Sequence, residues 1–169
     1  MKTTHLLKFV IIALSVATLS SCSTSRKAER NFYAVYSQKL GVQLEGNEDK
    51  DLIKAMASWK GVPYRYGAAS KRGTDCSGFT SQLYQEVYGK KLHRSSKDQV
   101  KDVRYISKRN LKAGDLIFFK IESRKVSHVA VYIADNKFIH ATTRKGVMVD
   151  DMDNKYYSKY YFKSGRVRM

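Results

Sequence analysis

The sequence predicts an α+β fold. Apolar residues with helical spacing dominate the first half of the chain, and short apolar runs separated by turn residues follow from residue 116 onward. Helices that come first and strands that come afterwards are typical of α+β proteins. The chain has 169 residues, which is long enough for one such domain and short for two.

The N-terminus is typical of an export signal. Lys2 and Lys8 precede an apolar run over residues 9–19, which is too short to span a bilayer. The Leu-Ser-Ser-Cys sequence that ends at Cys22 resembles the bacterial lipobox. We therefore expect a lipoprotein signal peptide over residues 1–21 and a lipid on Cys22. The alternatives are an ordinary secretory signal or a disulfide between Cys22 and Cys76.

The charge of the chain indicates an anionic partner. Its 32 basic and 15 acidic residues give a formal net charge of +17. We expect no nucleic acid, because an exported chain rarely meets it and no zinc-finger spacing or aromatic ribonucleoprotein motif is present. Cell-wall polymer or an anionic membrane surface fits better. Such an excess of charge bears on location and encounter rather than on chemistry.

The chain after the signal divides into an N-terminal segment and a domain. Residues 23–30 are polar without an apolar period, which predicts a tether, and residues 31–44 could be helical. We therefore expect residues 22–46 to form the lipidated N-terminus, the tether and a short helix. The domain is expected over residues 47–169.

Three helices are predicted within the domain. Asn47 is a plausible N-cap for a helix that ends at Gly61, and a second helix ends at Gly89. A third, short helix is expected over residues 97–103, where a preceding serine can cap it. The apolar stripes of the first two helices indicate core-facing sides, and they consist of Leu52, Ile53, Met56 and Trp59, and of Phe79, Leu83 and Val87.

A lone cysteine, Cys76, lies at the start of the second helix. Unpaired backbone N–H groups and the positive end of the helix dipole favour a thiolate there, and the thiolate is the nucleophile. The ordinary alternative is a buried structural cysteine. Upstream, a glycine-flanked loop carries Tyr64 and Tyr66, which could bring backbone and phenol groups close to a substrate. Cys76 is therefore a candidate catalytic residue.

Five apolar runs in the second half of the chain predict strands. A turn over residues 111–115 precedes the first run, which is apolar throughout and indicates a buried strand. The predicted strands cover residues 116–119, 126–134, 138–142, 146–149 and 162–169.

His128 and His140 lie on neighbouring predicted strands. A two-residue turn between these strands would place the two rings on opposite faces of the sheet. A three-residue loop over residues 134–136 would instead pair Ala130 with His140, so that both rings share one face. Asn136 suits the left-handed third position of such a loop, and we predict this loop.

With that geometry, Cys76, His128 and His140 form a candidate catalytic set. Cys76 would be the nucleophile, His128 the general base and acid, and His140 the group that orients His128. One cysteine and two histidines are also a zinc ligand set. A zinc-bound thiolate would lose the activation of the helix start, however, and no further ligand lies at suitable spacing. We therefore expect no metal and no cofactor.

Three segments resemble the signatures of the NlpC family of cell-wall cysteine peptidases. They are Asp-Cys-Ser-Gly-Phe at residues 75–79 and the segments around the two histidines, residues 127–133 and 138–141. The likeness runs from about Leu52 to the C-terminus. It is strongest to the lipoprotein murein endopeptidases of the Spr/MepS kind.

This resemblance implies a papain-like NlpC fold, in which N-terminal helices, including the cysteine helix, pack on a central antiparallel sheet. Residues 47–169 would then be an NlpC-type cysteine peptidase domain that hydrolyses peptides in peptidoglycan. The family also assigns Tyr64 to the oxyanion site. By analogy, Asp75 and Ser77 would line the substrate cleft.

The resemblance leaves the cleaved bond open. We expect cleavage of cross-links between stem peptides, and the alternative is the D-glutamyl to diamino-acid bond within a stem. A non-catalytic wall-binding lipoprotein and an acyltransferase or amidase on the same scaffold are the other hypotheses. The expected location is the cell envelope, lipid-anchored at the periplasmic face of the outer membrane.

Overall fold

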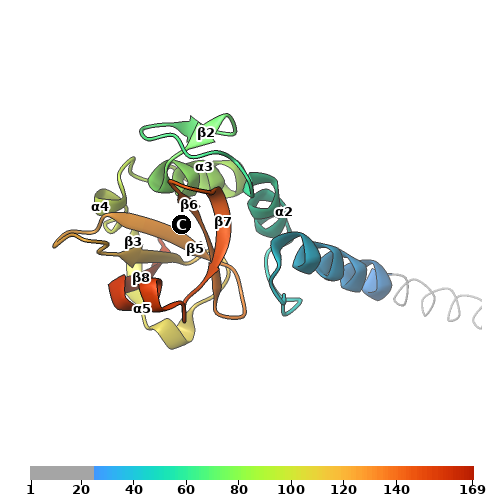
Figure 1. Ribbon diagram of the computed structural model, residues 1–169. Helices are drawn as coiled ribbons and strands as arrows, with labels where there is room; N and C mark the ends of the chain where they lie inside the picture. Colours follow the sequence, from blue (N-terminus) through green and yellow to red (C-terminus); the bar gives the residue numbers. More distant parts are fainter. Residues whose placement is uncertain (1–24) are drawn as a thin grey trace, which may run out of the picture.

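A computed structural model of the chain describes residues 25–169, so the predicted signal peptide and Cys22 lie outside the described residues. The main body is a six-stranded sheet with helices packed against it (Figure 1). All neighbouring strands of this six-stranded sheet are antiparallel, in the order β3-β8-β4-β5-β6-β7. The strands are β3 (Val103–Ile106), β4 (Leu116–Phe119), β5 (His128–Tyr132), β6 (Lys137–Thr142), β7 (Gly146–Asp151) and β8 (Tyr161–Val167).

Most of the helices come before the strands of this sheet along the chain, and α5 lies between β7 and β8. The predicted α+β class is confirmed, because α2 and α3 precede the sheet along the chain and α3 lies across it (Figure 1). A hairpin of two short strands, β1 (Ala69–Ser70) and β2 (Gly73–Thr74), leads into α3. The helices are α2 (Lys50–Trp59), α3 (Cys76–Tyr88), α4 (Ser96–Gln99), the 3₁₀ helix η1 (Lys108–Asn110) and α5 (Lys155–Tyr160).

The core explains why β4 is apolar throughout. Side chains alternate along a strand, so Leu116 and Phe118 join the cluster beneath α2 and α3, whereas Ile117 and Phe119 join a second cluster on the other face. Tyrosines of α5 and the start of β8 cover this second cluster. Both faces of the central sheet are therefore buried, and all four residues of β4 are within 1% of complete burial.

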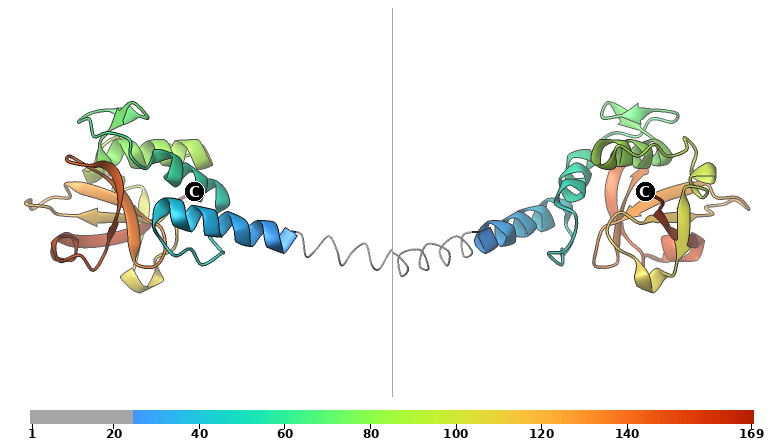
Figure 2. Two further views of the ribbon diagram at one scale, coloured as in Figure 1. Left: turned by 45° about the vertical axis from the view of Figure 1, so that its right-hand side comes forward. Right: turned by 180° about the vertical axis from the view of Figure 1, so that it is seen from behind.

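The helix of residues 25–40 projects away from the body, as the two further views in Figure 2 show. It is tied to the body through Tyr33, whose hydroxyl donates to the Glu48 carbonyl at 2.7 Å, through the buried Leu40, and through an ion pair between Glu29 and Lys50. Residues 25–30, which belong to the predicted tether, are helical, and their role as a tether remains a prediction. Arginine, lysine, alanine and glutamate favour helix without needing a buried stripe. Among the described residues, no helix combines the length and apolar content needed to cross a membrane.

Two local predictions need correction, and two elements, β3 and α5, were not predicted. The N-cap of α2 is Asp49 rather than Asn47, because the Asp49 carboxylate accepts from the N–H groups of the first turn. The helix predicted over residues 97–103 stops at Gln99, and Val103 begins the edge strand β3. That strand pairs with β8, at the far end of the chain, so local sequence does not reveal it. Helix α5 was not predicted.

The start of α3 is fixed by a side-chain cap and a close contact. The Asp75 carboxylate accepts from Gly78 N–H at 2.7 Å, which satisfies one of the free donors of the first turn. Gly78 lies so close to the hairpin that an added Cβ would meet the Ala68 carbonyl oxygen at 2.3 Å. The left-handed Gly89 ends the helix, as predicted.

We expect Gly78→Ala to destabilise the protein by about 2 kcal/mol or more, because the new methyl group must push the Ala68 carbonyl or the helix aside. Urea unfolding monitored by circular dichroism measures this loss. Gln85→Ala, on the exposed side of the same helix, is the matched control and should stay within about 0.5 kcal/mol of wild type. Equal stabilities of the two variants would contradict the close packing.

Candidate active site

The structure brings four predicted site residues into one cleft of 310 Å³. Cys76 comes from the start of α3, His128 from β5 and His140 from β6, and Tyr64 comes from the loop before β1. Residues from the sheet edge and α5 complete the lining: Ile121, Ser127, Ala141, Thr142, Thr143, Tyr156 and Tyr157. Residues more than seventy positions apart along the chain therefore face one space.

The β5–β6 loop sets the relation between the two histidines. Val131 pairs with Ile139 and Tyr132 with Phe138, and the Lys137 N–H donates to the Ala134 carbonyl at 2.8 Å. This is the predicted three-residue loop, and its third residue, Asn136, has the expected left-handed backbone with φ of 58°. The prediction is confirmed.

The two imidazoles meet as this register requires. His128 Nε2 lies 2.8 Å from His140 Nδ1, a hydrogen bond between the rings. His140 is completely buried, with the rings of Phe138 and Tyr157 edge-on to it at 5.0 and 5.1 Å. Packing on both sides holds this ring in place. His140 can therefore orient His128, as predicted for it, and that role remains a prediction.

The Cys76 thiol is in a setting that differs from the expectation. Burial raises its pKa, although the backbone N–H groups of Val129, Ser77 and Cys76 itself act in the opposite direction. We predicted that the helix start favours a thiolate. This is wrong for the free protein, because burial affects the pKa of Cys76 more than the backbone N–H groups do. The backbone N–H of Val129, the residue after His128, lies near enough to the Cys76 sulfur to lower its pKa. The sulfur therefore lies beside β5.

His128 is matched to this neutral thiol. Burial and the neighbouring His140 lower the pKa of His128 to about 3, so its imidazole is neutral at physiological pH. A neutral imidazole is a base, and a neutral thiol is a proton donor. Both side chains line one cleft, and a proton donor beside a base is the combination that general base catalysis requires.

Tyr64 lies at the mouth of the site. A parallel bridge to Thr74 fixes its backbone, and the Arg65 N–H donates to the Thr74 carbonyl at 2.9 Å. Burial and then the proximity of Cys76 raise the pKa of the Tyr64 phenol. The phenol therefore stays protonated and able to donate a hydrogen bond near the sulfur.

Asp75 and Ser77 line an extension of the cleft, together with Arg94. The Asp75 carboxylate accepts from Arg94 through both oxygens, at 2.9 and 2.7 Å, and also from Gly78 N–H, Gly67 N–H and the Ser77 hydroxyl. Although burial acts to raise the pKa of Asp75, Arg94 and the two N–H groups hold it below its usual value. The substrate-binding role predicted for both residues is untested, and the observed contacts are within the protein.

Sequence reasoning missed Asp150 and Tyr157, which surround His140. Asp150 Oδ2 lies 3.9 Å from His140 Nε2, and Tyr157 packs on the ring. Only the register of β6 with β7 could have pointed to Asp150, and the predicted strand stopped at Val149. Within residues 25–169, no group of three or more histidine, cysteine or carboxylate side chains is arranged to hold a metal ion.

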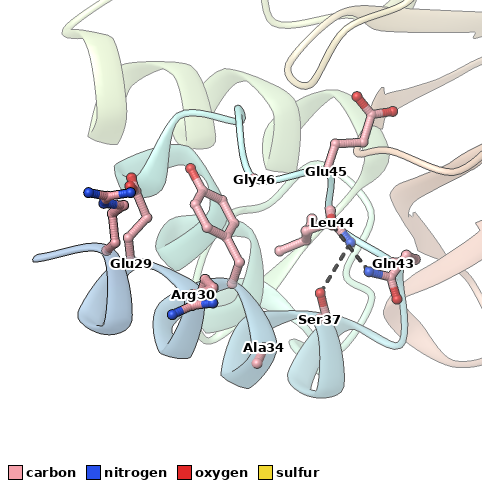
Figure 3. A pocket seen from close by; sticks show the side chains of 10 residues that line it. Glu29, Arg30, Ala34, Ser37, Gln43, Leu44, Glu45 and Gly46 are labelled. Atoms are coloured by element: carbon pink, nitrogen blue, oxygen red, sulfur yellow. Dashed lines mark hydrogen bonds between the residues drawn. The ribbon is translucent and has the colours of Figure 1, made fainter. Parts of the chain in front are cut away.

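A larger cavity, of 870 Å³, lies far along the chain from this site, between the helix of residues 25–40 and the segment that follows it (Figure 3). Its wall is held by the bond from Leu44 N–H to the Ser37 hydroxyl at 3.1 Å. The lining contains charged side chains, among them Glu29 and Glu45, but no cysteine or histidine. This cavity therefore lacks both residue types on which the candidate active site depends.

A cysteine at a helix start, packed against an antiparallel sheet that carries a hydrogen-bonded imidazole pair, defines a thiol hydrolase of the papain-like class. The chain belongs to the NlpC/P60 family, whose model matches residues 61–166. The predicted membership in this family of cysteine peptidases is confirmed.

Known relatives cover nearly the whole chain. A protein of Escherichia coli strain K12 named murein DD-endopeptidase MepS/murein LD-carboxypeptidase is 34% identical over 171 residues, covering 93% of this chain and 90% of the relative. The probable endopeptidase NlpC of the same strain is 36% identical over 162 residues, covering 95% and 100%. The crystal structure of an NlpC/P60 family protein from Bacillus cereus ATCC 10987 matches with a TM-score of 0.64 at 33% identity, covering 69% of this chain and 39% of that one.

We expect kcat/KM to form a broad bell against pH. The acidic limb should fall well below pH 6.5, because His128 keeps its proton-free form down to its lowered pKa, and protonation below that pKa removes the base. The alkaline limb should lie above about 8.5, the usual thiol pKa, because burial raises that of Cys76. The two limbs belong to the pair rather than to either residue.

Initial rates of muropeptide cleavage from about pH 2.5 to 10 measure this profile, with circular dichroism at each pH to verify folding. An acidic limb centred near 6.5 would contradict the lowered pKa of His128.

Proposed function

We propose that the protein is a peptidoglycan endopeptidase that uses Cys76 to hydrolyse amide bonds of stem peptides. The observation that carries the proposal is the 2.8 Å bond between His128 and His140 in the cleft that Cys76 lines. This arrangement supplies a nucleophile, a base and an orienting group at once. Membership in the NlpC/P60 family and similarity to a relative named as a murein endopeptidase support the choice of substrate.

In the first half of the reaction, the Cys76 sulfur attacks the carbonyl carbon of the scissile amide while His128 takes the thiol proton. The Tyr64 hydroxyl and the Cys76 backbone N–H donate to the oxyanion of the tetrahedral intermediate. His128 then gives its proton to the amide nitrogen, the C–N bond breaks, and the amine leaves. The acyl group remains on the sulfur as a thioester.

In the second half, His128 removes a proton from water, whose oxygen attacks the thioester carbonyl. The tetrahedral intermediate collapses, the C–S bond breaks, and His128 returns the proton to the sulfur. The products are an amine and a carboxylic acid, which loses its proton to solvent, and the enzyme regains its neutral thiol and imidazole. All groups in this cycle come from the chain itself.

We infer that the bond cut is the cross-link between stem peptides. The relative with 34% identity is named a DD-endopeptidase, and it aligns with 93% of this chain. Hydrolysis of the D-glutamyl to diamino-acid bond within a stem is the alternative that product analysis would reveal. The high positive charge, +17 for the chain, suits an enzyme that works on an anionic wall.

We further propose that the enzyme is held in the cell envelope by a lipid on Cys22, at the periplasmic face of the outer membrane. In this arrangement residues 1–21 are the signal peptide and residues 22–46 join the lipid to the peptidase domain of residues 47–169. Support comes from the lipobox-like sequence. The helix of residues 25–40, which projects away from the body, could hold the cleft at a distance from the membrane (Figure 2).

We expect Cys76→Ala to reduce cleavage of purified sacculi by at least about 1000-fold, because the proposed acyl intermediate forms on the Cys76 sulfur and alanine removes it. Wild type should convert cross-linked muropeptide dimers to monomers, as measured by mass spectrometry. Gln85→Ala on the same helix is the control and should retain full activity. Equal digestion by wild type and Cys76→Ala would end the proposal. A wild type that binds sacculi without cleaving them would indicate a wall-binding protein.

For the anchor, we expect cells fed a radiolabelled fatty acid to label the wild-type protein but not a Cys22→Ser variant. The thioether linkage to lipid requires the cysteine sulfur, which serine lacks. The label is read by gel autoradiography after immunoprecipitation, with Cys76→Ala as the control that should label normally. An unlabelled wild type would refute lipidation of Cys22.

A further inference from the structure

One buried nitrogen in the site has no partner. His140 is completely buried, and its Nε2 makes no hydrogen bond within the described residues. Its other nitrogen, Nδ1, is bonded to His128. Buried polar atoms are nearly always paired, so an unpaired one requires a reason. The Asp150 carboxylate oxygen Oδ2 faces this nitrogen at 3.9 Å, too far for a direct hydrogen bond but close enough for strong attraction to an N–H.

We propose that Asp150 is a positioning residue that keeps the His140 proton on Nε2 and thereby sets the tautomer of His128. An ionised carboxylate accepts and cannot donate, so it favours an N–H on the nitrogen that faces it. The proton on Nε2 leaves Nδ1 of His140 as an acceptor, and His128 Nε2 must then donate to it. The lone pair of His128 falls on Nδ1, the nitrogen left to act as base toward Cys76. This role rests on the proposed function.

The sheet and the following turn aim Asp150 at His140. In the β6–β7 pairing, Phe138 is opposite Asp150, so the side chains of Phe138, His140 and Asp150 belong to one face. Asp150 Oδ1 is occupied, because it accepts from the Asp151 N–H at 3.0 Å and from Asn154 Nδ2 at 3.4 Å. Oδ2 is the oxygen turned toward His140.

The other groups around His140 cannot replace Asp150. His128 on β5 is neutral, and Phe138 on β6 is apolar. On α5, burial and then the charge of Asp150 raise the pKa of Tyr157 to about 12, so its phenol is neutral as well. Although burial acts to raise the pKa of Asp150, His140 and the Asp151 N–H hold it below its usual value, so it remains ionised. Among the described residues, Asp150 is the one carboxylate within 4.0 Å of a His140 nitrogen.

Two substitutions separate proton positioning from mere packing. In Asp150→Asn, the amide carbonyl should keep the Oδ1 place, because the Asp151 N–H requires an acceptor there. The NH₂ group then faces His140 Nε2 and favours the wrong tautomer. In Asp150→Ala, neither tautomer is favoured. We therefore expect kcat to fall at least about tenfold in the asparagine variant, by as much as or more than in the alanine variant, with KM within about twofold of wild type.

A packing role predicts the opposite order, because asparagine keeps the shape of aspartate and alanine does not. An asparagine variant that retains wild-type kcat, or is clearly more active than the alanine variant, would overturn the proposal. Asp51→Asn, at an exposed carboxylate on α2 whose ion-pair partner Lys54 is also exposed, is the control and should behave as wild type. Thermal unfolding of each variant verifies that the compared proteins are folded.

The tautomer can be read directly by long-range ¹⁵N–¹H correlation spectra of the protein with ¹⁵N-labelled histidine. The wild type should show His140 protonated on Nε2 and His128 unprotonated on Nδ1, and Asp150→Asn should reverse both. Unchanged tautomers in Asp150→Asn would refute the positioning role. These spectra need no substrate, so a wild type that cleaves no muropeptide would refute the proposed function while the spectra still decide the role of Asp150.

Discussion

The register between β5 and β6 is the constraint on which the site depends. Side chains alternate on a strand, so a slip of one residue would turn His140 to the opposite face and separate it from His128. The loop at residues 134–136 fixes that register, and both Asp135 and Asn136 adopt positive φ there. Few residues accept this backbone. A short turn remote from the chemistry thus decides whether the two imidazoles meet at 2.8 Å.

The cysteine is held by a second, independent arrangement. The Asp75 carboxylate caps α3 and accepts a hydrogen bond from Gly67 N–H in the loop before β1. It also accepts from Arg94 in the segment after α3. Because one carboxylate joins three pieces of chain, the start of α3 cannot move without breaking several charge-assisted bonds. Preorganisation of this kind keeps the sulfur at a fixed place against β5. Gly78 adds to it by allowing the Ala68 carbonyl to pack directly on the helix.

Local sequence was sufficient for the features that local chemistry decides. The apolar stripe of Phe79 and Leu83, the stop at Gly89 and the loop ending at Asn136 were predicted because each depends on neighbouring residues. The edge strand β3 was missed because its partner, β8, lies some sixty positions away. Asp150 was missed for the same reason, because only the pairing of β7 with β6 brings it close to His140. The thiol pKa was misjudged because burial, which sequence does not quantify, outweighs the backbone N–H groups at the sulfur.

Charge and burial act on different parts of the molecule. Most of the basic residues within residues 25–169 are exposed, where their charge can attract an anionic polymer over about a Debye length. Inside the cleft the reacting thiol and imidazole are both neutral, because burial raises the pKa of Cys76 and lowers that of His128. In the proposed mechanism, charge separation therefore occurs only when the sulfur attacks a carbonyl, at the moment when the proposed oxyanion donors can stabilise it. In that mechanism burial delays ionisation of Cys76 until a substrate is bound, and the exposed charge governs only how often that happens.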